Sequence, residues 1–233
     1  MIGEWSQGLL TSFLLNNQGM IKNIYKKSFQ NYKSQMQNGK FENAEKILQK
    51  IIKINPVKGW YHFGLLYPML VSKKIFQKTV LSKQIEYFNR SLSYDKKNPA
   101  TWRALGNTLF QLKKYDAAEE AYKQSLEYSR SELYKNDALR FLADILIVRR
   151  QFKKAFQILN KILHSKHRPP YIQLANHFIV YYQKIGNQKL VNYWAKKAIT
   201  SAKIIEKSGK PAYGPKDTYR RAVKYFESFI NKK

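Results

Sequence analysis

The histidines are the residues best suited to metal or acid–base chemistry, and one pair is close enough in sequence to act together. His164 and His167 are three residues apart, the spacing at which two side chains on a helix can share one ligand. No acid lies between Ile145 and Ile205 to complete a metal site, and the two prolines after the pair favour a helix end. The chain has no cysteine, which excludes disulfides, thiolate metal sites and cysteine nucleophiles. The sequence therefore predicts no metal site.

Carboxylates offer no clearer catalytic site. Glu119 and Glu120 follow Asp116 near the predicted start of a helix, where negative charge suits the helix dipole. The sequence has no glycine-rich phosphate loop, no G-x-S-x-G nucleophile motif and no H-E-x-x-H zinc motif. We expect a protein that is not an enzyme and that needs no cofactor.

The elements that must position any binding residues recur along the chain. One unit combines large and small residues at helical spacing: Trp102, Leu105, Gly106, Leu109, Ala118, Tyr122 and Ser125. Trp102 and Leu105 supply bulk for a core, whereas Gly106 lets a neighbouring helix approach closely. Ala118 and Ser125 leave room for that approach. The pattern resembles the tetratricopeptide repeat signature, W-x2-L-G-x2-Y followed by A-x3-F and a later small residue. The resemblance implies an all-α fold, a right-handed superhelical solenoid of helical hairpins.

About five such units are predicted, with other segments at each end. The units span residues 25–56, 57–98, 99–132, 136–169 and 172–205, followed by a linker at 206–215 and a capping helix at 216–233. The unit 57–98 exceeds the usual length of about 34 residues, which implies a longer helix pair or a loop around Ser72 to Ser82. Pro68 is a candidate kink in its first helix.

Most aromatic residues are expected in the core of the repeats. Those on motif positions are Trp60, Tyr67, Phe88, Trp102, Tyr122, Phe178 and Tyr182. Four others have no motif position and are expected at the surface or at an end of the array: Tyr171, Tyr181, Tyr193 and Trp194.

Residues 1–24 are predicted to form an N-terminal helical cap or an amphipathic segment. Their apolar cluster is too short and too polar to span a bilayer, and it lacks the basic leader of a secretory signal. Residues 5–41 carry five lysines and no acid, and an apolar helix face is available from Trp5, Leu9, Phe13, Ile21 and Ile24. Two interpretations stay open: a cap that packs on the first repeat, as solenoids need, and an interfacial helix on a membrane surface.

The charge balance favours an anionic partner. Lysine and arginine number 43 against 15 acids, which leaves a net charge of +28. Codon bias in an AT-rich genome is the alternative explanation, because 34 of the 43 basic residues are lysine, although the scarcity of acids does not fit it. From Ile145 to Ile205 there are twelve basic residues and no acid. The candidate anion-binding residues are Arg149, Arg150, Lys153, Lys154, Lys196, Lys197, Arg220 and Arg221.

A second candidate site lies on the first helices of the hairpins, whose exposed face should line the concave groove of such a superhelix. Arg103 and Asn107 are one turn apart, and they resemble the first two members of the carboxylate clamp with which chaperone adaptors of this family hold a peptide C-terminus. The following repeats have Arg140 and His177 in the same register, so the clamp is incomplete. We expect a peptide or helix site with Arg103, Asn107, Arg140 and His177 as contacts.

Three functions remain open at this stage. The first is a protein–protein interaction scaffold, a subunit or assembly factor whose groove binds protein and whose basic C-terminal half contacts an anionic component. The second is a nucleic-acid-associated protein, for example ribosome-bound, whose lysines contact phosphates of RNA. The third is an adaptor at a membrane surface. The expected location is intracellular, in a cytoplasm or organelle, including the periphery of a membrane.

Overall fold

The structure is a computed structural model, and it describes residues 3–71, 77–166, 171–207 and 218–230. These ranges contain eleven helices and no strand. In chain order they are α1 (Gly3–Gln37), α2 (Phe41–Ile54), α3 (Pro56–Leu70), α4 (Gln77–Tyr94), α5 (Pro99–Gln111), α6 (Tyr115–Tyr128), α7 (Glu132–Val148), α8 (Phe152–Leu163), α9 (Tyr171–Lys184), α10 (Gln188–Lys207) and α11 (Thr218–Ile230). None of these helices is long and apolar enough to cross a membrane.

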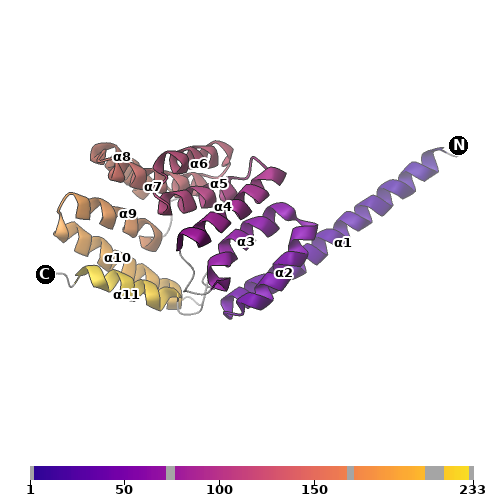
Figure 1. The fold of residues 1–233 in the computed structure, drawn as a ribbon, viewed down its shortest axis with the longest axis horizontal. Coiled ribbons are helices and arrows are strands. Elements are labelled where there is room, and N and C mark those ends of the chain that lie inside the picture. The colour runs from indigo at the N-terminus through magenta and orange to yellow at the C-terminus, as the bar shows by residue number, and fades with distance from the viewer. Residues whose placement is uncertain (1–2, 72–76, 167–170, 208–217, 231–233) are drawn as a thin grey trace.

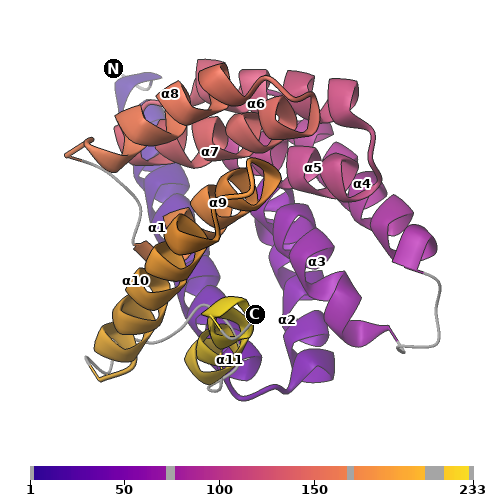
Figure 2. The same cartoon turned by 90° about the vertical axis from the view of Figure 1, so that its left-hand side faces the viewer.

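The helices form a curved array of antiparallel hairpins. Each helix from α2 to α10 packs against its neighbours in sequence, and α7 also packs against α9. The array bends so that the first helices α5 and α7 lie on its inner side and the second helices α6 and α8 on its outer side (Figure 2). The all-α solenoid predicted from the motif is confirmed.

Two kinds of turn set the hairpins in register. Between hairpins, an asparagine followed by a proline starts the next first helix: Asn55 and Asn98 accept hydrogen bonds from the backbone N–H groups of Lys58 and Thr101, each at 3.1 Å. Within hairpins, the residue two places before each second helix is left-handed in four cases: Gly39, Lys113, Arg150 and Gly186, with φ of 71°, 60°, 59° and 76°. Lysine and arginine therefore hold a backbone conformation that favours glycine.

The small residues of the motif allow the close helix packing that was predicted for them. A Cβ built on Gly106 would lie 2.6 Å from the ring of Tyr122, and one on Gly64 would lie 2.5 Å from the ring of Phe88. The hydroxyl of Ser125 also donates a hydrogen bond to the carbonyl of Pro99 at 2.9 Å. The serine therefore fixes the start of the first helix as well as leaving space.

The burial of the aromatic residues confirms one prediction in part, since Trp60, Tyr67, Trp102 and Tyr182 are only partly buried, and it corrects another. Phe88, Tyr122 and Phe178 are fully buried, as expected from their motif positions. Trp194 was expected at the surface or an end, but it is 5% exposed and stacks on Phe178 with ring centroids 4.1 Å apart. Trp194 is a core residue because α9 and α10 place the two flat rings face to face. Tyr193 is exposed, and the side chain of Tyr171 lies outside the described residues.

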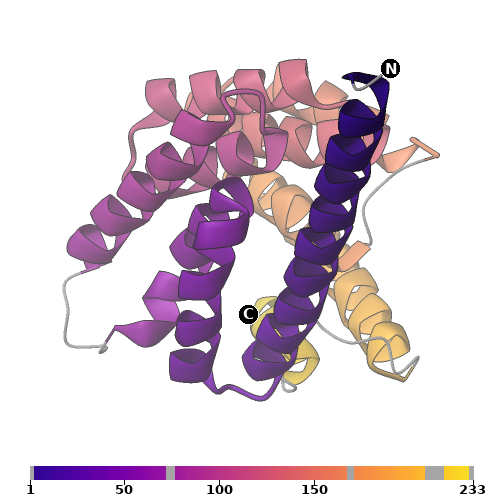
Figure 3. The same cartoon turned by 90° about the vertical axis from the view of Figure 1, so that its right-hand side faces the viewer.

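The longer unit and the two ends have their own structures. Pro68 lies inside α3, two residues before its end, and α4 is 18 residues long against 14 for α2 and α6. Most of the predicted linker 206–215 lies outside the described residues, and α11 packs against α10 with Phe226 buried. At the other end α1 runs unbroken through residue 24, and its N-terminal half projects from the array (Figure 1). Figure 3 shows α1 joined to α2 at the opposite end of this long helix.

Candidate functional site

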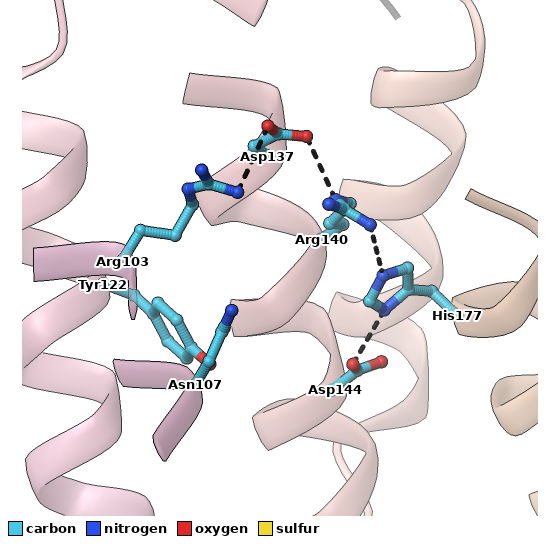
Figure 4. Close-up of polar contacts among 7 residues, drawn as sticks. All are labelled: Arg103, Asn107, Tyr122, Asp137, Arg140, Asp144 and His177. Atoms are coloured by element: carbon cyan, nitrogen blue, oxygen red, sulfur yellow. Dashed lines mark hydrogen bonds and ion pairs between the residues drawn. The ribbon is translucent and has the colours of Figure 1, made fainter. Parts of the chain in front are cut away.

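A row of charged side chains crosses the first helices of three neighbouring hairpins, α5, α7 and α9 (Figure 4). Arg103 Nη1 lies 3.5 Å from Asp137 Oδ2, and Arg140 Nε donates to Asp137 Oδ1 at 3.2 Å. Arg140 Nη1 lies 3.1 Å from His177 Nε2, and His177 Nδ1 lies 2.7 Å from Asp144 Oδ2. We call these five residues the inner charged row. It connects three repeats through side chains alone.

The geometry fixes where the imidazole proton sits. An arginine N–H can only donate, so His177 Nε2 accepts from Arg140, and Nδ1 carries the proton donated to Asp144. Both partners are almost inaccessible, with His177 3% and Arg140 8% exposed. Burial lowers the pKa of Arg140, while the neighbouring carboxylate of Asp137 opposes that effect. The second carboxylate oxygen of Asp144 is buried and accepts no hydrogen bond from the described part of the chain.

Aromatic rings hold the row from one side. The Arg140 guanidinium lies over the ring of Phe141, 4.5 Å from its centroid, and the edge of His177 meets the same ring at 5.3 Å. Phe141 also stacks on Tyr122, with ring centroids 5.5 Å apart. The Tyr122 hydroxyl in turn donates to Asn107 Oδ1 at 2.8 Å, and burial raises the pKa of that hydroxyl. Packing therefore restricts the rotamers of the whole row.

The four predicted groove residues fall into two pairs. Arg103 and Asn107 are partly exposed on α5, where a partner can reach them. Arg140 and His177 are packed between α7 and α9 and bonded to each other, so only their edges are open to a partner. The two aspartates that join the groups were not singled out from the sequence. The signal was present, because Arg103 and Asp137 are 34 residues apart and Asp144 and His177 are 33 apart, about one repeat.

The predicted anion-binding residues also differ in their surroundings. Lys153 and Lys154 on α8 and Lys196 on α10 are exposed on second helices. Arg149 instead forms ion pairs with Asp116 and Glu119 of α6.

The remaining members have other contacts. Arg220 lies 3.7 Å from Glu206, and Lys197 lies over the ring of Tyr193 at 5.3 Å. Arg221 is exposed on α11. The exposed lysines of α8 and α10 are therefore the members of the set whose charge is most accessible.

Arg150 lines a pocket that was not predicted from the sequence. The pocket has a volume of about 570 Å³ and lies at the edge where the hairpins turn. The lining residues are Tyr115, Ile147, Val148, Arg150, Phe152 and Lys184. The repeated left-handed turns bring these residues from three hairpins to one edge.

No group of three or more histidine, aspartate or glutamate residues in the described ranges could hold a metal ion. His164 Nδ1 lies 2.9 Å from the carbonyl of Asn160, so its ring meets a helix-end carbonyl. His167 lies outside the described residues.

Comparison with known families matches the repeat motif. Residues 33–58 and 99–131 each match a family model described as a tetratricopeptide repeat. The chain therefore carries tetratricopeptide repeats. Such repeats are protein-interaction modules, and arrays of this fold are typically non-catalytic, so this tetratricopeptide array is a protein-interaction scaffold. Comparison with curated protein sequences finds no significant match.

Solved structures of other tetratricopeptide proteins share the fold at low sequence identity. The crystal structure of MamA protein has 18% identity and a TM-score of 0.50, covering 82% of this chain and 98% of that one. A tetratricopeptide repeat protein from Parabacteroides merdae has 12% identity and a TM-score of 0.53, covering 90% and 81%. A chain of the APC/C hetero-tetramer Cut9-Hcn1 has 15% identity and a TM-score of 0.58, covering 86% of this chain and 37% of that one. These likenesses extend to the fold and no further.

Proposed function

We propose that the protein is a subunit or assembly factor of a larger complex, and that the inner surface of α5, α7 and α9 binds a peptide or helix of a protein partner. The inner charged row carries this proposal. Arg103 and Asn107 present donors to a ligand. Asp137 holds Arg103, the Tyr122 hydroxyl holds Asn107, and Arg140 links Asp137 to His177. The row contains two arginines and two aspartates, so it suits a ligand that offers both acceptors and donors, such as an extended peptide backbone.

Arg103→Gln tests the proposal with little structural cost, because Asp137 keeps its hydrogen bond from Arg140. Arg130→Gln is the matched control, since Arg130 is an exposed arginine between α6 and α7 and loses the same charge. Tagged proteins are used to recover partners from native extract, and each preparation is divided into nuclease-treated and untreated halves. We expect a set of protein partners that survives nuclease, is retained by Arg130→Gln and is lost with Arg103→Gln. Equal recovery by both variants would exclude the inner surface as the site.

We propose a second contact, in which an anionic partner binds the outer surface of α8 and α10. This partner is an anionic protein or, as the exposed lysines favour, RNA. Lys153, Lys154 and Lys196 are exposed in a stretch of the chain that contains no acid. Nonspecific phosphate contacts of this kind weaken steeply as the salt concentration rises. The slope of log affinity against log salt concentration is about −0.9 for each phosphate neutralised in a duplex and about −0.7 for each one in a single strand.

Titration of the protein with a single-stranded RNA at several salt concentrations separates the exposed lysines from the paired arginine. The variant Lys153→Gln/Lys154→Gln should flatten the salt slope by about 1.4, the contribution of two phosphate contacts. Arg149→Gln should change it less, because Asp116 and Glu119 already offset that charge. Partners that vanish with nuclease in the extract experiment would make RNA the primary ligand. A salt slope near zero would exclude RNA as the ligand of these lysines and would indicate that the anionic partner is a protein.

A further inference from the structure

Helix α1 has two apolar faces that point in different directions. Tyr25, Phe29, Tyr32 and Met36, in its C-terminal half, pack against the core formed by α2 and α3. Further toward the N-terminus the exposed apolar residues are Met20, Ile21 and Ile24, which are 56%, 48% and 46% exposed. At about 100° per residue the second face is rotated from the first by roughly 100°. The packed face therefore does not include the apolar residues at positions 20–24.

The part of α1 that precedes the second face projects from the array (Figure 1). On the other side of the helix, a Cβ built on Gly19 would meet nothing within 4 Å. Residues 20–24 of α1 thus present exposed apolar side chains that the described part of the array does not cover.

Charge decides among the occupants that such a face could take. A second copy would bring another +28 against the first, and like-charge repulsion opposes that pairing. Residues 5–21 contain no charged residue, so a partner helix would have only the lysines that follow them to pair with. A lipid bilayer surface needs only the apolar area, and Lys22, Lys26 and Lys27 are exposed where this segment meets the array.

We propose that the exposed segment in the middle of α1, residues 20–27, lies in the surface of an anionic lipid bilayer, with Met20, Ile21 and Ile24 among the acyl chains and Lys22, Lys26 and Lys27 at the headgroups. The contact would hold the array at a membrane while its inner surface stays open. It does not depend on the proposed peptide site, because no residue is shared.

A single fluorophore can report insertion, because the chain has no cysteine of its own. Ile21→Cys and Gly19→Cys, labelled with a polarity-sensitive dye, place probes about 160° apart around the helix at nearly the same height. With vesicles of phosphatidylcholine and phosphatidylserine, the dye at position 21 should shift to the blue and be quenched by lipids brominated on their acyl chains. The dye at position 19 should respond weakly. Equal responses at the two positions would overturn the proposal.

Sedimentation with the same vesicles separates insertion from simple attraction of a basic protein. Met20→Ser/Ile24→Ser should lower the partition coefficient by about tenfold or more, since two buried apolar side chains are lost. The control Gln18→Ser/Asn23→Ser changes two exposed polar residues and should bind like the unmodified chain. Identical binding by both variants would mean that the lysines alone hold the protein, and the proposal would be wrong. A blue shift of the dye at position 21 in the absence of vesicles, together with a dimer in analytical sedimentation of the protein alone, would instead identify a second copy of the chain as the occupant.

Discussion

Gly106→Ala should destabilise the array although alanine is the better helix former. The new Cβ would lie 2.6, 2.7 and 3.0 Å from three ring carbons of Tyr122. The ring has little freedom to retreat, because Phe141 stacks on it at 5.5 Å and its hydroxyl is held by Asn107 at 2.8 Å. Overpacking of this kind costs about 1–3 kcal/mol, and the helix propensity of alanine returns up to about 1 kcal/mol. We expect a net loss of about 1–2 kcal/mol in the free energy of unfolding.

Urea unfolding followed by far-UV circular dichroism measures this loss, with Gly19→Ala as the control. Gly19 is also helical, but a Cβ there meets nothing within 4 Å, so the control should not lower the midpoint. The cause is isolated by Gly106→Ala/Tyr122→Leu, in which the smaller side chain removes the contact. The double variant should be more stable than the sum of the two single losses by about 1 kcal/mol. An unchanged midpoint for Gly106→Ala, or additive losses, would refute the packing account.

Three further predictions concern other parts of the chain. Burial beside Lys33 and Lys58 lowers the pKa of His62 to about 4, so the unfolded chain takes up the proton first as the pH falls. Stability should therefore fall by up to about 3 kcal/mol between pH 6.5 and 4, and His62→Phe should remove that part of the pH dependence of the urea midpoint. Trp194→Ala should cost about 3–5 kcal/mol in urea unfolding, because it empties the space against Phe178, and a loss below 1 kcal/mol would contradict its place in the core. In thermal unfolding, Lys113→Gly should raise the free energy of unfolding by roughly 0.5–1 kcal/mol, because Lys113 has a φ of 60°, which favours glycine. Lys114→Gly should not raise it, because Lys114 has a φ of −84°.

The packing within each repeat could be predicted from the sequence because each motif residue contacts a neighbour that is close to it in the same hairpin. Gly106 and Tyr122 face each other in one hairpin, so their types and spacing suffice to predict the close approach. Trp194 was misplaced because the motif fixes Ala195 and Ala198 but says nothing of the residue beside them. The flat packing of Trp194 on Phe178 depends on the relative rotation of α9 and α10, which only the assembled hairpin sets.

The polar contacts were harder to predict because they join different repeats. Arg140 meets His177 across 37 residues, and its neighbour Asp144 reaches the same imidazole across 33. Neither distance follows from helical spacing within one element. The extent of α1 was missed for the opposite reason, since residues 20–36 contain no proline or glycine that would end the helix, and the change of apolar face occurs within it.

The structure bears on the competing explanations of the net charge of +28. Codon bias in an AT-rich genome adds lysines without regard to position. Four acids in the middle of the array have defined internal partners: Asp116 and Glu119 hold Arg149, while Asp137 and Asp144 hold the inner charged row. These acids neutralise charges within the chain, and they do little for the exposed lysines of α8 and α10. An anionic ligand would supply that neutralisation, and its contribution should fade with salt while the apolar contact proposed for α1 should persist.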